Sequence, residues 1–221
     1  MTAAGNLGAI LPRQPESCFW EITDACNLRC IHCEAESGTR DPEELTTDEA
    51  LDLAHQLAEA GCEHVHLTGG EPLLRKDWPR LARRLGQHGL GVTVITNGVL
   101  LDDKMVERLV EAGVSGASVS LDGDQEVHDT IRAPCNSSAG SRYHAAVGAI
   151  ERLVASPLKA AVITQVHKRN IHDLGRMYAQ MVSLGVDAWQ VQIAMPLGRL
   201  LDIRYQYLME PSQIPGLLEQ L

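Results

Sequence analysis

Three cysteines, Cys26, Cys30 and Cys33, lie within eight residues, and thiolates at such spacing bind metals or carry out redox chemistry. A structural zinc site needs four ligands, usually as two close pairs, and His32 or Cys18 would have to supply the fourth. A thiol–disulfide motif would use Cys30 and Cys33 as a Cys-x-x-Cys pair, which leaves Cys26 without a role. An iron–sulfur cubane held by three thiolates keeps one iron open for a further ligand. The spacing alone leaves these chemistries open.

The segments that must position these cysteines alternate between strand-like and helix-like patterns. Segments with apolar residues three and four apart predict helices, and residues 46–49 (TTDE) form a capping-box pattern at the start of the first. Serial strand–helix units predict parallel strands joined by right-handed crossovers, in an open doubly wound sheet or a barrel. Periodicity does not choose between these two α/β folds. Short runs rich in β-branched and apolar residues predict strands at 19–23, 64–68, 92–96, 117–121, 160–166 and 188–193.

Glycine-rich and polar motifs follow successive predicted strands. Each is common as a simple turn, but the C-terminal ends of parallel strands meet at one face, where β/α barrels carry their active sites. Their joint placement therefore indicates one shared site. The motifs are Gly69-Gly70-Glu71-Pro72 after the second strand, Thr96-Asn97-Gly98 after the third, Ser118-Val119-Ser120-Leu121-Asp122-Gly123 ending the fourth, and His128-Asp129 followed by Arg132.

The Cys-x3-Cys-x2-Cys spacing and these motifs, in this order, resemble the radical S-adenosylmethionine (radical SAM) superfamily over about residues 17–200. The resemblance implies a partial (β/α)6 barrel of the TIM type. It also implies a 4Fe–4S cluster in which Cys26, Cys30 and Cys33 each bind one iron, with the fourth chelated by SAM. Such a cluster, once reduced, cleaves SAM to a 5′-deoxyadenosyl radical that abstracts hydrogen from a substrate.

The same resemblance implies which residues contact SAM. Glu71 is expected to accept a hydrogen bond from the SAM amino group, and Arg132 to pair its planar fork with the SAM carboxylate. The two glycines of the GGEP motif let the backbone approach a ligand closely. The expected SAM-binding residues are His32, Gly69, Gly70, Glu71, Pro72, Thr96, Asn97, Ser118, Ser120, Asp122, Arg132 and Gln165. No catalytic acid or base is assigned.

The segment CFWEITDACNLRCIHC resembles the starts of radical SAM enzymes with a C-terminal SPASM or twitch domain, which include ribosomal-peptide maturases and haem-pathway enzymes. The expected substrate is a peptide or protein side chain. The alternatives are a small molecule of cofactor or tetrapyrrole biosynthesis, or a scaffold that binds SAM or metal without catalysis.

The expected domains are an N-terminal extension (1–16), the core (17–200) and a C-terminal segment (201–221) that starts a truncated further domain. No cysteine follows Cys135, although an auxiliary cluster needs several. The chain is therefore expected to be either a fragment or a relative without auxiliary clusters.

Composition and net charge indicate which classes of binding partner are expected. The 221 residues carry a net charge of -10, which gives no attraction to phosphate backbones, so a nucleic acid is not expected. The N-terminus lacks the basic region of a secretory signal, and no stretch approaches the ~18 apolar residues of a membrane span. The expected location is the cytoplasm, with an electron donor such as flavodoxin or ferredoxin. The remaining cysteines and two histidines are interpreted as packed residues rather than ligands; they are Cys18, Cys62, Cys135, His64 and His66.

Overall fold

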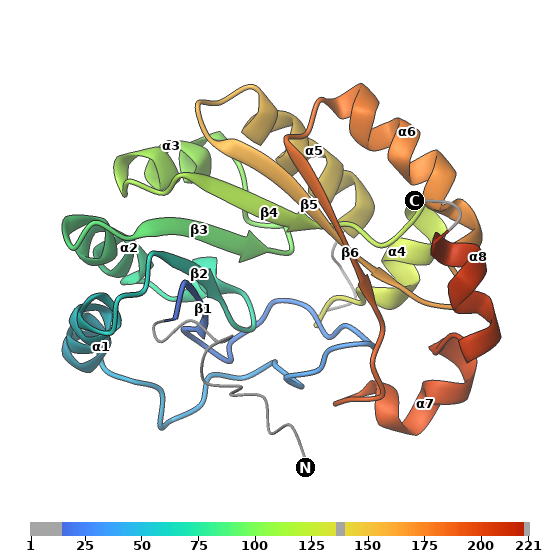
Figure 1. Cartoon of the computed structure of the whole chain (residues 1–221), viewed down its shortest axis with the longest axis horizontal. Helices are drawn as coiled ribbons and strands as arrows, with labels where there is room; N and C mark the ends of the chain where they lie inside the picture. Colours follow the sequence, from blue (N-terminus) through green and yellow to red (C-terminus); the bar gives the residue numbers. More distant parts are fainter. Residues whose placement is uncertain (1–14, 136–139, 219–221) are drawn as a thin grey trace, which may run out of the picture.

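The protein is described here by a computed structural model, covering residues 15–135 and 140–218. Residues 1–14, most of the expected N-terminal extension, lie outside this range. Six parallel strands pair in sequential order to form one curved sheet, a half-barrel, and Figure 1 shows helices along its outer side. The strands are β1 (Ser17–Glu21), β2 (His64–Thr68), β3 (Gly91–Thr96), β4 (Gly116–Ser120), β5 (Lys159–Val166) and β6 (Ala188–Ile193).

The helices alternate with the strands as expected. The first, α1, begins where the sequence predicts, because Thr46 accepts a hydrogen bond from the backbone N–H of Glu49 and the Glu49 side chain accepts one from that of Thr46. The helices are α1 (Thr47–Glu59), α2 (Trp78–Gln87), α3 (Asp103–Glu111), α4 (Gln125–Ile131), α5 (Arg142–Val154), α6 (Leu174–Leu184), α7 (Leu200–Tyr207) and α8 (Ile214–Leu218), with short 3-10 turns η2 (Pro72–Leu74), η3 (Ile171–Asp173) and η4 (Pro211–Gln213). None of these helices, within the described ranges, is long and apolar enough to cross a bilayer.

The partial β/α barrel predicted from the sequence is confirmed. All six strands occur close to the expected positions, and pairing is parallel throughout. The largest difference is in β1, which begins at Ser17 rather than at residue 19, because Ser17 pairs with His64 at the start of β2. Figure 1 shows α1, α2, α3, α5 and α6 along the outer side of the sheet, whereas α7 lies apart from this row.

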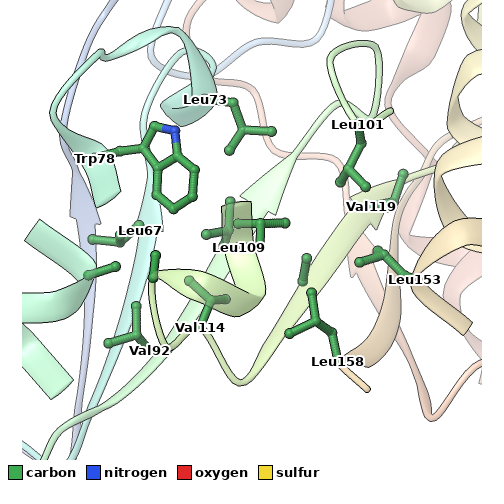
Figure 2. Packing of buried hydrophobic residues seen from close by; sticks show 14 of the residues in the cluster. Leu67, Leu73, Trp78, Val92, Leu101, Leu109, Val114, Val119, Leu153 and Leu158 are labelled. Atoms are coloured by element: carbon green, nitrogen blue, oxygen red, sulfur yellow. The ribbon is translucent and has the colours of Figure 1, made fainter. Parts of the chain in front are cut away.

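The main core lies between the sheet and the outer helices. Outward-facing strand residues such as Leu67 and Val92 are fully buried, and Figure 2 shows Trp78 of α2 beside Leu67 and Leu73. Because strand side chains alternate between faces, the intervening residues point to the inner face. On β2 and β3 the inward residues are only half-buried. The inner face is therefore available to a ligand.

A smaller core links helix α7, which follows β6, to the barrel. Leu200 and Tyr207 of α7 are buried with Ile131 of α4 and Ala194, and Ile31 packs against them. The domain boundary expected at residue 200 thus falls at the first residue of a helix that packs on the barrel.

Candidate active site

The three cysteines line one cavity of about 280 Å³ at the C-terminal ends of the strands. Most of the expected SAM-binding residues line the same cavity, namely His32, Gly69, Gly70, Thr96, Asn97, Ser120, Arg132 and Gln165. The remaining expected residues, Glu71, Pro72, Ser118 and Asp122, do not line it. The cavity therefore gathers residues from the C-terminal ends of the strands and from the segments that follow them, as expected for the C-terminal face of a β/α barrel.

The cysteines lie on an irregular loop after β1 that is held by backbone hydrogen bonds to other segments. The N–H of Ile31 donates to the carbonyl of Ile131 (2.9 Å), and that of Cys26 donates to Gly38 (3.0 Å). Cys30 is 9% exposed. Burial is the largest cause that raises the pKa of its thiol, and burial raises the pKa of Cys26 to about 11. Metal binding must therefore release protons from these thiols.

The Gly69-Gly70 turn packs directly on the start of this loop. The N–H of Gly70 donates to the carbonyl of Thr23 (2.7 Å), and that of Glu71 donates to Ala25 (2.8 Å). A Cβ at Gly69 would lie 2.3 Å from the Thr23 carbonyl oxygen, and one at Gly70 would lie 2.4 Å from that of Ala25. Gly69 also has a φ of +134°, which disfavours other residues. The glycines are required by this close backbone approach.

The Glu71 side chain does not line the cavity. Its carboxylate is fully buried and accepts hydrogen bonds from Thr96 Oγ1 (2.9 and 3.0 Å) and the N–H groups of Asn97 (2.9 Å) and Leu73 (3.2 Å). Burial raises its pKa to about 7, although these hydrogen bonds oppose the shift. The Glu71 side chain thus lies behind the cavity and ties the turn after β2 to the loop after β3. Gly69 and Gly70 line the cavity at this turn, where the sequence predicted a contact from the Glu71 side chain.

Asp122 also lies behind the cavity, where its carboxylate contacts three residues that line it. Its Oδ2 accepts a hydrogen bond from Arg132 Nε (2.6 Å), and His32 Nε2 lies 3.5 Å from the same oxygen. Its Oδ1 accepts one from the N–H of Gln165 (2.9 Å). Burial opposes ionisation, but Arg132 and the nearby histidines hold the pKa of Asp122 below its usual value. Burial lowers the pKa of His32 to about 3, so its imidazole is neutral.

Three residues that line the cavity have buried polar atoms that make no hydrogen bond within the protein. His32 Nδ1, Ser37 Oγ and Gln165 Oε1 are buried without a hydrogen-bond partner in the protein, and all three residues line the cavity. Buried polar atoms almost always have partners, so such atoms indicate an absent polar ligand. SAM offers ribose hydroxyls, adenine nitrogens and an amino acid group as partners. Together with the glycine turn and Arg132, these residues fit SAM.

Several lining residues were not predicted from the sequence. They include Phe19, Ile95 and Ile163 on strands, Glu34 and Ser37 after the cysteines, and Gln192 and Arg199. Strand alternation could have found some of them, because Ile95 and Ile163 lie on the same face of the sheet as Ser120. Arg199 carries no such signal, since it follows β6 in an irregular segment.

The residues interpreted as packed behave mostly as expected. All six cysteines are free thiols; Cys62 is buried and Cys18 packs on the main core, whereas Cys135 is exposed. His66 Nδ1 lies 2.6 Å from Thr93 Oγ1. His64 and His66 are only half-buried on the inner face, so the expectation that they are buried is wrong. Among the described residues, no group of three or more His, Cys, Asp or Glu could hold a single metal ion. A multi-iron cluster differs, because each thiolate binds its own iron.

Comparison with known proteins identifies the family. The Radical SAM superfamily model matches residues 20–181. An AdoMet-dependent heme synthase of Methanosarcina barkeri is 37% identical over 187 residues, which are 84% of this chain and 52% of the relative. Mycofactocin maturase MftC of Mycobacterium ulcerans is 38% identical over 159 residues, which are 72% of this chain and 41% of the relative. The chain belongs to the radical SAM superfamily, and it spans about half the length of these curated relatives.

Solved structures share the fold. Streptococcus suis SuiB bound to S-adenosylmethionine superposes with a TM-score of 0.77 at 16% identity, covering 94% of this chain and 47% of SuiB. SuiB bound to the precursor peptide SuiA gives a TM-score of 0.71 at 16% identity, covering 86% of this chain and 42% of that one. Family membership implies a 4Fe–4S cluster and SAM, and it decides against the zinc and thiol–disulfide interpretations of the cysteines.

Proposed function

We propose that this chain is the catalytic core of a radical SAM enzyme that removes a hydrogen atom from a side chain of a peptide or protein. The observation that carries the proposal is the single cavity shared by Cys26, Cys30 and Cys33 with the glycine turn and Arg132. A bound 4Fe–4S cluster and SAM would supply the 5′-deoxyadenosyl radical.

The residues of the chain have separable roles in this proposal. Cys26, Cys30 and Cys33 would hold the cluster. Arg132, whose Nε is held by Asp122 (2.6 Å), would present the rest of its guanidinium to the SAM carboxylate. The other residues expected to contact SAM stay part of the proposal. Glu71 would act indirectly, by holding the turn after β2 in place through its hydrogen bonds.

The side chains on the inner face of the sheet favour a substrate that presents an uncharged group to the cavity. Beyond the cysteines, the strand residues that line the cavity include Phe19, Ile95 and Ile163, and among the described strands none of the lining side chains is charged. A tetrapyrrole carries several carboxylates, which require cations. In this proposal both lining arginines are engaged, Arg132 by Asp122 and the SAM carboxylate, and Arg199 by the carbonyl oxygens of Cys30 and Ser37. These contacts favour a peptide side chain over a tetrapyrrole.

A tetrapyrrole remains the second candidate, because the heme synthase of M. barkeri is 37% identical to this chain. A cytoplasmic location and reduction by flavodoxin or ferredoxin are further parts of the proposal. The six free thiols support a reducing compartment.

The test is anaerobic. The chain is reconstituted with iron and sulfide, reduced with dithionite and supplied with SAM, and 5′-deoxyadenosine is measured by chromatography beside a Cys30→Ala variant. Product in the wild type alone supports the proposal, and uptake of zinc without iron would refute it. Peptides encoded near the gene and iron-coproporphyrin are then compared as substrates by mass spectrometry. Modification of the porphyrin alone would favour the second candidate.

A further inference from the structure

The loop that carries the cysteines is held on two sides. One side is paired with the end of α4 and the segment after it, because the N–H of Arg29 donates to the carbonyl of Ala133 (2.7 Å) and that of Ile31 donates to the carbonyl of Ile131 (2.9 Å). The other side contacts the segment after β6, which reaches the loop at Gly198 and Arg199. These two residues were not among the expected site residues.

Arg199 bonds to three backbone carbonyls of the loop region. Its Nε donates to the carbonyl oxygen of Cys30 (2.8 Å), its Nη1 donates to that of Ser37 (3.1 Å), and its own N–H donates to that of Cys33 (3.1 Å). Two of the accepting residues are cysteines expected to bind iron. Hydrogen bonds from a guanidinium are charge-assisted and hold a fixed fork geometry, so Arg199 fixes the spacing of these carbonyls.

Gly198 allows this contact by bringing the two backbones together. A Cβ at Gly198 would lie 2.4 Å from the carbonyl oxygens of both Cys33 and Glu34, and the residue has a φ of +50°. The obstructing atoms belong to the backbone, so an alanine here would have to push the cysteine loop away. Gly198 and Arg199 therefore act on the same loop by different means, one by close approach and one by hydrogen bonds.

We infer that Gly198 and Arg199 form a clasp that holds the cysteine loop in the conformation that retains the cluster. Arg199 is a positioning residue, because it acts on the loop backbone. Its guanidinium lies in the lining of the same cavity as the three cysteines, so it would add a positive charge near a cluster that three thiolates make anionic. This inference rests on the proposed function, and the clasp adds to it how the loop is kept in shape.

The test measures iron retention and reduction potential separately from turnover. Arg199→Gln, Arg199→Lys and Gly198→Ala are reconstituted beside the wild type, and iron release to a chelator is followed under anaerobic conditions. Residues that support metal ligands typically contribute tenfold to a hundredfold to metal affinity. We expect Arg199→Gln and Gly198→Ala to release iron about tenfold to a hundredfold faster, and Arg199→Lys to fall between them and the wild type.

The controls separate the clasp from general effects of charge or of an added methyl group. Arg83→Gln removes an exposed arginine of α2, and Gly175→Ala adds a Cβ that meets nothing within 4 Å. Both should release iron at the wild-type rate. The reduction potential should become more negative in Arg199→Gln, which loses the positive charge, and should stay near the wild-type value in Gly198→Ala.

Wild-type iron release in both Arg199→Gln and Gly198→Ala would overturn the clasp. Weaker SAM binding in Arg199→Gln with unchanged iron release would also overturn it, and would make Arg199 a direct SAM contact. Thermal unfolding of the iron-free variants shows whether the fold survives, and Arg199→Lys provides the milder variant. If the wild type assembles a cluster and cleaves SAM, the proposed function stands whatever the variants show. If the wild type takes up no iron, the proposed function fails first.

Discussion

Replacing Asp122 by Asn is expected to destabilise the fold strongly, because it leaves a buried guanidinium without its counter-charge. The Asp122 side chain is fully buried, that of Arg132 is 11% exposed, and their Oδ2 and Nε atoms are 2.6 Å apart. Breaking such a buried pair by removing one partner costs about 3–5 kcal/mol. For a domain of this size, that loss lowers the Tm by about 6–20 °C.

The assay is urea unfolding of the iron-free protein, combined with a double-mutant cycle. Arg132→Met removes the other partner, and the double variant has neither charge. The double variant should lose less stability than the sum of the single losses, with a coupling energy of at least about 1 kcal/mol. Asp103→Asn is the matched control, because its ion pair with Arg152 is exposed and should contribute less than about 1 kcal/mol. A loss in Asp122→Asn no larger than in this control would refute the reasoning.

The same carboxylate predicts a pH dependence. Burial opposes ionisation of Asp122, but Arg132, His32 and His128 hold its pKa below the usual value. The unfolded state therefore binds more protons, and the contribution of Asp122 to stability is present above the unfolded pKa of about 3.9 and is lost as the pH falls towards the native pKa. Asp122→Asn should flatten the fall in stability below about pH 4. If the stability of Asp122→Asn fell with decreasing pH as steeply as that of the wild type, this assignment would be contradicted.

Three further predictions test single residues of the site. Gly70→Ala would place a Cβ 2.4 Å from the Ala25 carbonyl oxygen, so reconstitution should incorporate much less iron, as measured by iron analysis, than in wild type. His32→Phe removes the unpartnered Nδ1 and should raise the Kd for SAM about tenfold in calorimetry while iron content is unchanged. Glu71 has a native pKa of about 7, above its unfolded value of about 4.3, so the iron-free protein should lose stability as the pH rises between them. Glu71→Gln should remove that slope from a pH series of urea midpoints.

The fold could be predicted from the sequence because its signals are local. Most strands are short runs rich in β-branched and apolar residues, and α1 begins at a capping box that is present in the structure. The placement of the site was also predictable, since loops at the C-terminal ends of parallel strands must meet at one face. Cys26, Gly69, Asn97 and Ser120 accordingly line a single cavity.

The direction of individual side chains could not be predicted in the same way. Ser118 and Ser120 are two residues apart on β4 and share a face, yet only Ser120 lies near enough to the strand end to reach the cavity. Glu71 and Asp122 turn away from the cavity, because backbone N–H groups of Asn97 and Gln165 and the Arg132 side chain supply their partners. Those donors come from other segments of the chain, and no spacing in the sequence indicates their approach.

The shape of the cysteine loop depends on contacts from distant parts of the chain. Its start is packed against Gly70, its middle pairs with Ile131, and Arg199 contacts Cys30 from a position 169 residues away. The shape of the loop therefore depends on contacts with segments as distant as the one that follows β6. Zinc fingers differ, because there metal binding drives folding of a chain that is unfolded without it. Because the contacts that shape this loop come from the completed half-barrel, we expect iron to enter the cysteine loop after the barrel has formed rather than to drive its folding.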